Sequence, residues 1–323
     1  MSLQENIEKL SDSVKMGSQQ CRYWMVRTNA GAYFDLFVKN DYVALSRNDI
    51  PYNLLYEAKQ QYHDKTNVII KKVKEAIKKS STIDKSGYDE RSLSLAISQV
   101  YKFVYEVQKN DIVIIPSEKS DEICIGVFTE DNLADSQQTN ENFVYTRKVR
   151  WIKLLKKRFF DPFFYKLFTS HHAICDVSPY QEYIERCIRS QFVINDESHY
   201  VIALTSEKIK ARHLFKFGDL MLELFEDYIK SESLNFDINS IDASINLNSP
   251  GRIDFKSNVK IGALLMLFIP AILTGCTNAE GHQDNAEIYN SIFNFRNTHS
   301  DRINELDSLI NSLQVKKIED SFN

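Results

Sequence analysis

The sequence predicts an α+β protein: an N-terminal β-barrel with a helical insertion, a small β-α-β-β unit, a hydrophobic helix and a helical tail. Three patterns lead to this prediction, namely strand-like alternation, lysine-rich segments with helical spacing, and one long apolar run. The 323 residues, of which 43% are hydrophobic and 26% charged, suffice for two folded domains. Only 9 Gly and 6 Pro are present, so long disordered linkers are not expected.

The N-terminal half begins with strand signals. Residues 22–28 (RYWMVRT) alternate large apolar and polar residues, and residues 42–45 begin a second strand. Residues 53–107 carry many lysines and place apolar residues at helical spacing, which predicts a helical insertion. We therefore expect the early strands to be separated from the rest of their sheet by helices.

A β-hairpin is predicted after this insertion. Two apolar runs, Ile112–Ile115 and Ile123–Val127, flank a polar connector that contains a proline. Phe143–Leu155 follows as a basic strand. The pattern then changes near residue 192, where a strand, a long amphipathic helix and two short strands are predicted; these are residues 199–206, 209–229, 240–247 and 252–256.

The apolar run from Ile261 to Cys276 has 16 residues without a charge, a length between that of a core helix and that of a membrane span. Basic residues precede the run and acidic residues follow it, which favours a membrane span with the N-terminal part in the cytoplasm. We thus expect a cytoplasmic protein anchored to the inner membrane by one C-terminal helix. The predicted domains are 20–190, 195–258, the hydrophobic helix 259–276 and the helical tail 277–323.

Four short motifs, in order, resemble the PUA-like and EVE-like barrel domains that precede bacterial restriction endonucleases. They are Tyr23-Trp24-Met25-Val26-Arg27, Asp111-Ile112-Val113, Ile125-Gly126-Val127 and Arg147-Lys148-Val149-Arg150-Trp151. The resemblance covers roughly residues 20–190. It implies a pocket beside the barrel that holds a nucleobase, often a modified one, with Trp24, Arg27 and Trp151 at the matching positions. Asn110 stands where the family usually has Gly.

Charge supports the same expectation. The net charge is −4, so any nucleic-acid binding must come from a local patch. Such a patch is predicted between Arg147 and Lys166, where eight basic residues accompany one acid and several aromatic residues. The candidate residues for binding a base or nucleic acid are therefore Trp24, Arg27, Arg147, Lys148, Arg150 and Trp151.

Catalytic and metal signals are weak. The cysteines number five and none are in CxxC spacing, which suits a reducing compartment. His171, His172 and Cys175 are too few for a structural zinc, and no cofactor is predicted. Asp254-Phe255-Lys256 is similar to the acid-x-lysine motif of Mg²⁺-dependent restriction nucleases, and the alternative is a strand with Asp254 and Lys256 facing solvent.

The sequence therefore predicts a nucleic-acid or modified-base binding protein rather than an enzyme. By resemblance and layout, a membrane-attached sensor or effector of bacterial defence against phage would fit. Two alternatives stay open. One is a restriction-type nuclease acting through Asp254 and Lys256, and the other is a structural protein that forms homo-oligomers through residues 259–323.

Overall fold

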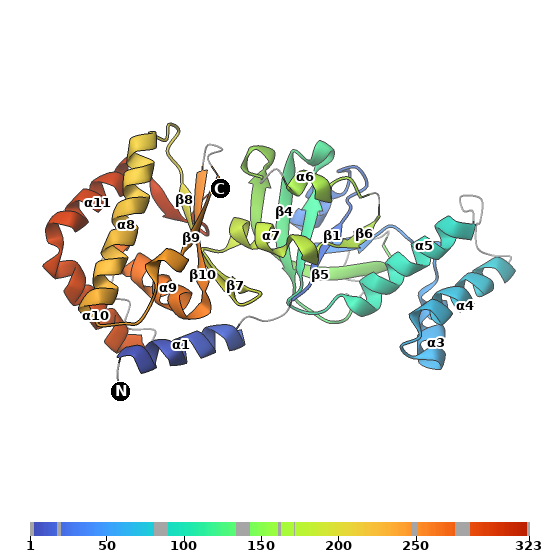
Figure 1. Cartoon of the computed structure of the whole chain (residues 1–323). Coiled ribbons are helices and arrows are strands. Elements are labelled where there is room, and N and C mark those ends of the chain that lie inside the picture. The colour runs from blue at the N-terminus through green and yellow to red at the C-terminus, as the bar shows by residue number, and fades with distance from the viewer. Residues whose placement is uncertain are drawn as a thin grey trace. The chain divides into compact units, whose positions relative to one another are not determined.

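The computed structural model describes residues 3–17, 21–80, 90–133, 143–160, 163–170, 172–246, 251–274 and 285–321. The chain divides into two compact units, whose elements are labelled in Figure 1. The half-barrel unit is Cys21–Gln181, and the split unit is Met1–Gln20 together with Glu182–Asn323. Each unit combines a sheet with helices, which confirms the α+β class.

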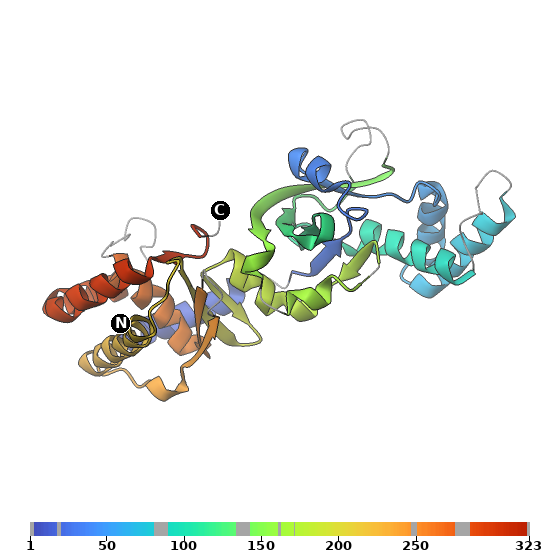
Figure 2. The same ribbon diagram turned by 90° about the horizontal axis from the view of Figure 1, so that it is seen from above.

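The sheet of the half-barrel unit has six strands in the order β2-β5-β4-β3-β1-β6. Their bounds are β1 Tyr23–Val26, β2 Tyr42–Leu45, β3 Ile112–Pro116, β4 Glu122–Phe128, β5 Tyr145–Lys156 and β6 Ile174–Asp176. Only the β1–β3 pair is parallel. The sheet curves, as Figure 2 shows, but β2 and β6 end the strand order, so it is an open half-barrel where the sequence predicted a barrel.

Helices fill the connection between β2 and β3, as the lysine-rich segment predicted. The helices of this unit are α2 Phe34–Lys39, α3 Tyr52–Tyr62, α4 Thr66–Lys79, α5 Glu90–Tyr101 with a π-helical extension Lys102–Glu106, and α6 Phe164–Leu167. α3, α4 and α5 pack side by side (Figure 1). Their apolar stripes, which include Leu55, Ile69, Val73 and Ile97, are buried in the same core as the strands.

The split unit has a sheet of order β11-β8-β10-β9, with β7 also paired to β8, and every pair in it is antiparallel. The strands are β7 Gln191–Ile194, β8 Glu197–Leu204, β9 Asp242–Asn246, β10 Gly251–Asn258 and β11 Val315–Lys317. The helices are α1 Leu3–Gly17, α7 Gln181–Ile188, α8 Ala211–Ser231, α9 Val259–Thr274, α10 Ala286–Thr298 and α11 Ser300–Leu313.

One face of β8 and β10 forms the core of the split unit. Tyr200, Ile202 and Phe255 pack there with apolar side chains of α1, α8, α9, α10 and α11. Since side chains alternate along a strand, the neighbours of Phe255 on β10, Asp254 and Lys256, belong to the opposite face. This alternation places charged groups on the sheet face that meets α7.

The predicted membrane span at residues 259–276 is wrong. α9 has 16 residues and ends at Thr274. At 1.5 Å per residue it is about 24 Å long, shorter than the hydrocarbon core of about 30 Å. Leu264, Phe268 and Ile272 of α9 are fully buried in the core of the split unit. No helix in the described ranges is long and apolar enough to cross a membrane, so the predicted anchor to the inner membrane is not supported.

Candidate functional site

Trp24 and Arg147, both predicted to contact a base or nucleic acid, are fully buried. The indole Nε1 of Trp24 donates to Asp111 Oδ2 at 2.8 Å, and the same carboxylate accepts backbone N–H groups of Arg22 and Gln108 at 2.9 Å. Trp24 thus joins β1 to the start of β3. Neither side chain offers a face to a ligand in this structure.

Arg147 uses its guanidinium to hold backbone carbonyl groups. Nε donates to Phe103 at 2.7 Å, Nη2 to Val104 at 2.8 Å, and Nη1 to Glu130 at 3.2 Å and to Asp131 at 3.0 Å. Burial lowers the pKa of Arg147 to about 10. All three nitrogens are engaged, so this arginine connects β5 to the helical insertion and to the segment after β4.

The other residues of the predicted patch are dispersed. Lys148 forms an ion pair with Glu130 at 3.2 Å, and Arg150 is exposed on β5. Trp151 is half-buried against the core, and its Nε1 donates to Phe37 O at 3.3 Å. These three side chains therefore do not converge with Trp24 on one pocket.

A hollow of about 530 Å³ does lie in the half-barrel unit, and Arg27 is one of its walls. It is lined by Arg27, Asn29, Ala30, Tyr33, Ala44, Leu45, Ser46, Arg47, Phe168 and Ala173. Arg27 follows β1 and Arg47 follows β2, two strands that are not neighbours in the sheet. The hollow thus lies between the C-terminal ends of β1 and β2.

The chemistry of this hollow is cationic and aromatic. Two arginines and the rings of Tyr33 and Phe168 line it, and none of the described lining residues is acidic. Arg27 Nε donates to Ser170 O at 3.0 Å, and Nη2 donates to Phe168 O and Ser170 O. Its Nη1 has no hydrogen-bond partner among the described residues. The guanidinium is therefore oriented by the chain through two of its three nitrogens.

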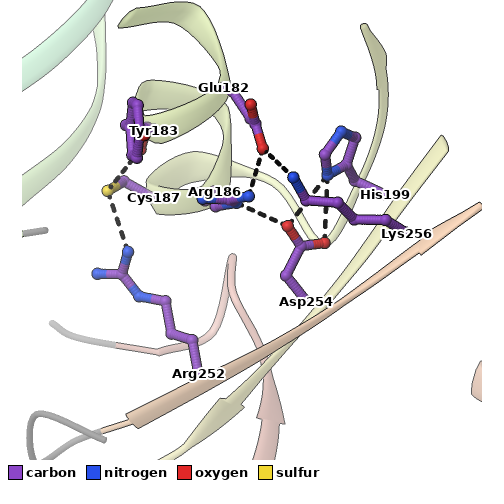
Figure 3. Close-up of polar contacts among 8 residues, drawn as sticks. All are labelled: Glu182, Tyr183, Arg186, Cys187, His199, Arg252, Asp254 and Lys256. Atoms are coloured by element: carbon purple, nitrogen blue, oxygen red, sulfur yellow. Dashed lines mark hydrogen bonds and ion pairs between the residues drawn. The ribbon is translucent and has the colours of Figure 1, made fainter. Parts of the chain in front are cut away.

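A polar cluster in the split unit is the second candidate site (Figure 3). Glu182 and Arg186 come from one face of α7, because residues i and i+4 are neighbours on a helix. His199 of β8 lies directly across from Lys256 of β10, and Asp254 is two residues before Lys256 on the same face. Four of these five residues are charged; His199 and Asp254 are 1% and 2% exposed.

Each carboxylate of the cluster is paired. Asp254 Oδ2 accepts from Arg186 Nε at 2.6 Å and lies 3.0 Å from His199 Nδ1. Glu182 Oε1 accepts from both Arg186 and Lys256. Burial raises the pKa of Glu182, but the hydrogen bond from Lys256 and the charge of Arg186 outweigh it and hold this pKa below its usual value.

The sequence analysis found part of this cluster. It singled out Asp254 and Lys256 but expected both to face solvent if they had no function, whereas α7 covers Asp254. It missed Glu182 and His199, which are separated from Asp254 by long stretches of chain. The only local signal was a histidine at the start of an apolar strand, HYVIAL. The nuclease alternative and the predicted homo-oligomer stay predictions.

The two histidines that gave a weak metal signal, His171 and His172, lie in the segment before β6. His171 lies outside the described residues. His172 Nδ1 is 3.1 Å from the side-chain amide of Gln99, whose oxygen accepts from Ala173 N at 2.8 Å. Gln99 thereby connects α5 to the segment before β6.

Comparison with known proteins gives one match. Residues 55–170 match a family model described as a domain of unknown function, DUF8426. The match extends from α3 to the end of the α6 region and includes neither Arg27 nor Arg47, nor any part of the split unit. No curated protein and no solved structure matches the chain.

Proposed function

We propose that the half-barrel unit binds a nucleic acid or a nucleotide in the hollow between the ends of β1 and β2. The observation that carries this proposal is the lining, with two arginines, two aromatic rings and no acid among its described residues. The volume of about 530 Å³ is in the usual range for small-molecule sites. The motif order that resembles PUA-like and EVE-like readers supports the same function.

Arginine suits this role because its planar guanidinium forms paired hydrogen bonds with phosphates and base edges. Arg27 is held by the carbonyl groups of Phe168 and Ser170, while no described residue binds its Nη1. A side chain that is ordered before binding loses less conformational entropy when a ligand arrives. Tyr33 and Phe168 add ring faces on which a base can stack.

The segment that leads to Phe168 extends this surface. Phe163 and Tyr165 are 45% and 46% exposed. Lys166 Nζ is 4.9 Å from the ring centre of Phe163, and Lys157 Nζ is 5.8 Å from that of Tyr165. Exposed rings beside ammonium groups supply stacking together with phosphate attraction, so a single strand could continue from the hollow along this segment.

The test is calorimetric titration of the full chain with nucleoside monophosphates and, separately, with short single-stranded DNA and RNA. Arg47→Ala and Arg27→Gln are expected to weaken binding about tenfold or more, since each removes a charged hydrogen-bond donor. Arg150→Ala is the matched control, because Arg150 is exposed and outside the hollow. We expect the parent chain to bind the mononucleotide and the Arg150→Ala variant to bind it equally well.

The titration with nucleoside monophosphates distinguishes a free nucleotide from a nucleic-acid strand as the ligand. Binding of oligonucleotides without binding of monophosphates would show that the ligand is a strand. Absence of binding in every arm, or equal losses in Arg47→Ala and Arg150→Ala, would overturn the proposal. Circular dichroism of each variant checks that it is folded.

A further inference from the structure

We propose that Glu182, His199 and Asp254 form a binding site for a first-row divalent transition-metal ion such as Zn²⁺ or Mn²⁺. The three side chains come from α7, β8 and β10, and their ligand atoms all lie within 4.8 Å of one another (Figure 3). The site belongs wholly to the split unit. It is therefore independent of the function proposed for the half-barrel unit.

The spacing of the ligand atoms fits one ion. Imidazole nitrogen and carboxylate oxygen bind Zn²⁺ at about 2.0–2.2 Å, so two ligands of the same ion are separated by about 3–3.5 Å in tetrahedral geometry. His199 Nδ1 lies 3.3 Å from Asp254 Oδ1 and 3.0 Å from Asp254 Oδ2. Glu182 of α7 faces the same point with an oxygen within 4.8 Å of the other two ligand atoms, so a small movement of its side chain would bring it in as a third ligand.

The cluster also keeps unused electron pairs. An ionised carboxylate has about four acceptor positions. Glu182 Oε1 receives both cations, while its Oε2 accepts no hydrogen bond from the described residues. Asp254 Oδ1 has only the 3.3 Å contact with His199, because Arg186 binds Oδ2. His199 is 1% exposed, so its ring does not have to lose bound water before it accepts an ion. Binding through Nδ1 places the ring proton on Nε2, which has no hydrogen-bond partner among the described residues.

Arg186 and Lys256 neutralise the two carboxylates at present, so an ion must displace one of them. Lys256 is the group that can leave, because it carries its charge on a flexible stem and its side chain is 23% exposed. Arg186 is 14% exposed and binds Asp254 through Nε, where it would orient a ligating carboxylate from outside. Metal binding would thus release the Lys256 ammonium to solvent.

The ligand set selects the class of ion. Mg²⁺ and Ca²⁺ prefer oxygen ligands alone, whereas imidazole suits zinc and other later first-row metals. A buried histidine beside two carboxylates therefore favours Zn²⁺ over Mg²⁺, and the two carboxylates also admit Mn²⁺.

The experiment is calorimetric titration of the untagged full chain, stripped with chelator, with ZnCl₂, MnCl₂ and MgCl₂. One Zn²⁺ or Mn²⁺ per chain is expected, with weaker binding of Mg²⁺. Glu182→Gln, on the accessible side of the cluster, should weaken Zn²⁺ binding about 10-fold or more. Asp242→Asn, an exposed carboxylate on β9 opposite Lys256, is the control and should bind as the parent does.

Lys256→Met separates the metal site from a purely structural ion-pair network. If the ion competes with the ammonium for Glu182, the variant should bind Zn²⁺ at least about 10-fold more tightly. No saturable binding by either the parent or Lys256→Met would overturn the proposal. It would also be overturned if Glu182→Gln bound as the parent does, or if Lys256→Met bound more weakly.

Discussion

The two units bury charge in different ways. In the half-barrel unit, the buried guanidinium of Arg147 is surrounded by backbone carbonyl groups of four residues. In the split unit, the buried carboxylate of Asp254 is held by side chains, those of Arg186 and His199. Carbonyl groups are fixed by the backbone, whereas side chains can change rotamer.

This difference decides whether the partner of a buried charge can be replaced by another ion. Arg147 connects three segments and has no partner that can leave without unfolding the backbone around it. The cluster of the split unit contains a lysine that can withdraw, and one carboxylate oxygen of Glu182 is not engaged by any described residue. We therefore assign Arg147 to the fold and the cluster to a site.

Of the substitutions that test this difference, replacing Arg147 should lower stability the most. Arg147→Met is expected to lower the free energy of unfolding by about 3–5 kcal/mol, because it leaves buried carbonyl groups without donors. Both tryptophans, Trp24 and Trp151, belong to the half-barrel unit, so urea unfolding followed by tryptophan fluorescence reports on this unit.

Lys148→Met is the matched control for that measurement. Lys148 is the next residue along β5 and forms a partly exposed ion pair with Glu130, which contributes about 0–1 kcal/mol. A loss below about 1 kcal/mol for Arg147→Met would contradict the structural role given to this arginine.

In the split unit, Asp254→Asn should have a smaller effect. The amide keeps an acceptor for Arg186 but removes the charge, so we expect a loss of about 2–3 kcal/mol in unfolding followed by far-UV circular dichroism. Arg186 retains Glu182 as a partner, which limits the loss. Asp242→Asn serves as the exposed control. Equal stability of the two variants would show that the cluster does not stabilise the unit.

Alkaline pH should weaken both units. Burial raises the pKa of Tyr105 to about 12, and it also raises the pKa values of Tyr145, Tyr200 and Tyr228. These phenols lose their protons in the unfolded chain from about pH 10, before they do in the folded one. Their contribution is thus complete below pH 10 and is lost from about pH 10 to 12, at about 1.4 kcal/mol per pH unit for each group.

Urea midpoints at pH 9, 10 and 11 measure this effect. The lowered pKa of Arg147 acts in the opposite direction above pH 10 and reduces the loss in the half-barrel unit. Burial also raises the pKa of the Cys124 thiol in the half-barrel unit to about 12, and the stability lost there offsets the gain from Arg147. Both units should therefore lose stability with similar steepness above pH 10. A midpoint that stays constant up to pH 11 would be inconsistent with these shifts.

Local sequence patterns predicted the elements whose structure depends on residues close together in the chain. The apolar runs gave the hairpin of β3 and β4, and amphipathic spacing gave α8. The prediction for α9 failed because an all-apolar helix suits a protein core as well as a lipid bilayer, and its length was intermediate. The N-terminal helix α1 also joins this core, since Ile7 is buried and Glu8 lies 3.5 Å from Lys260 of α9.

Both candidate sites are formed by residues that are far apart in the sequence, so their contacts cannot be predicted from sequence spacing. Asp254 and Lys256 were found because they are two residues apart on one strand, but Glu182 and His199 reach them only through helix docking and strand register. Arg27 was identified and Arg47 was not, since the hollow joins the ends of two strands that are not adjacent. The apolar strand around Trp24 was the available sign that this residue is buried, whereas Arg147, between Thr146 and Lys148, has no such sign in the sequence.

The central claim, that the half-barrel unit binds nucleic acid through its arginine-lined hollow, is tested most directly by salt dependence. The measurement is fluorescence polarisation of a labelled single-stranded oligonucleotide with the full chain and with Arg47→Ala, at 50 and 200 mM salt. We predict binding that weakens with salt, and a variant that binds more weakly with a shallower salt slope because one phosphate contact is lost. Binding that is absent, or whose affinity and salt slope are the same in the variant, would contradict the account.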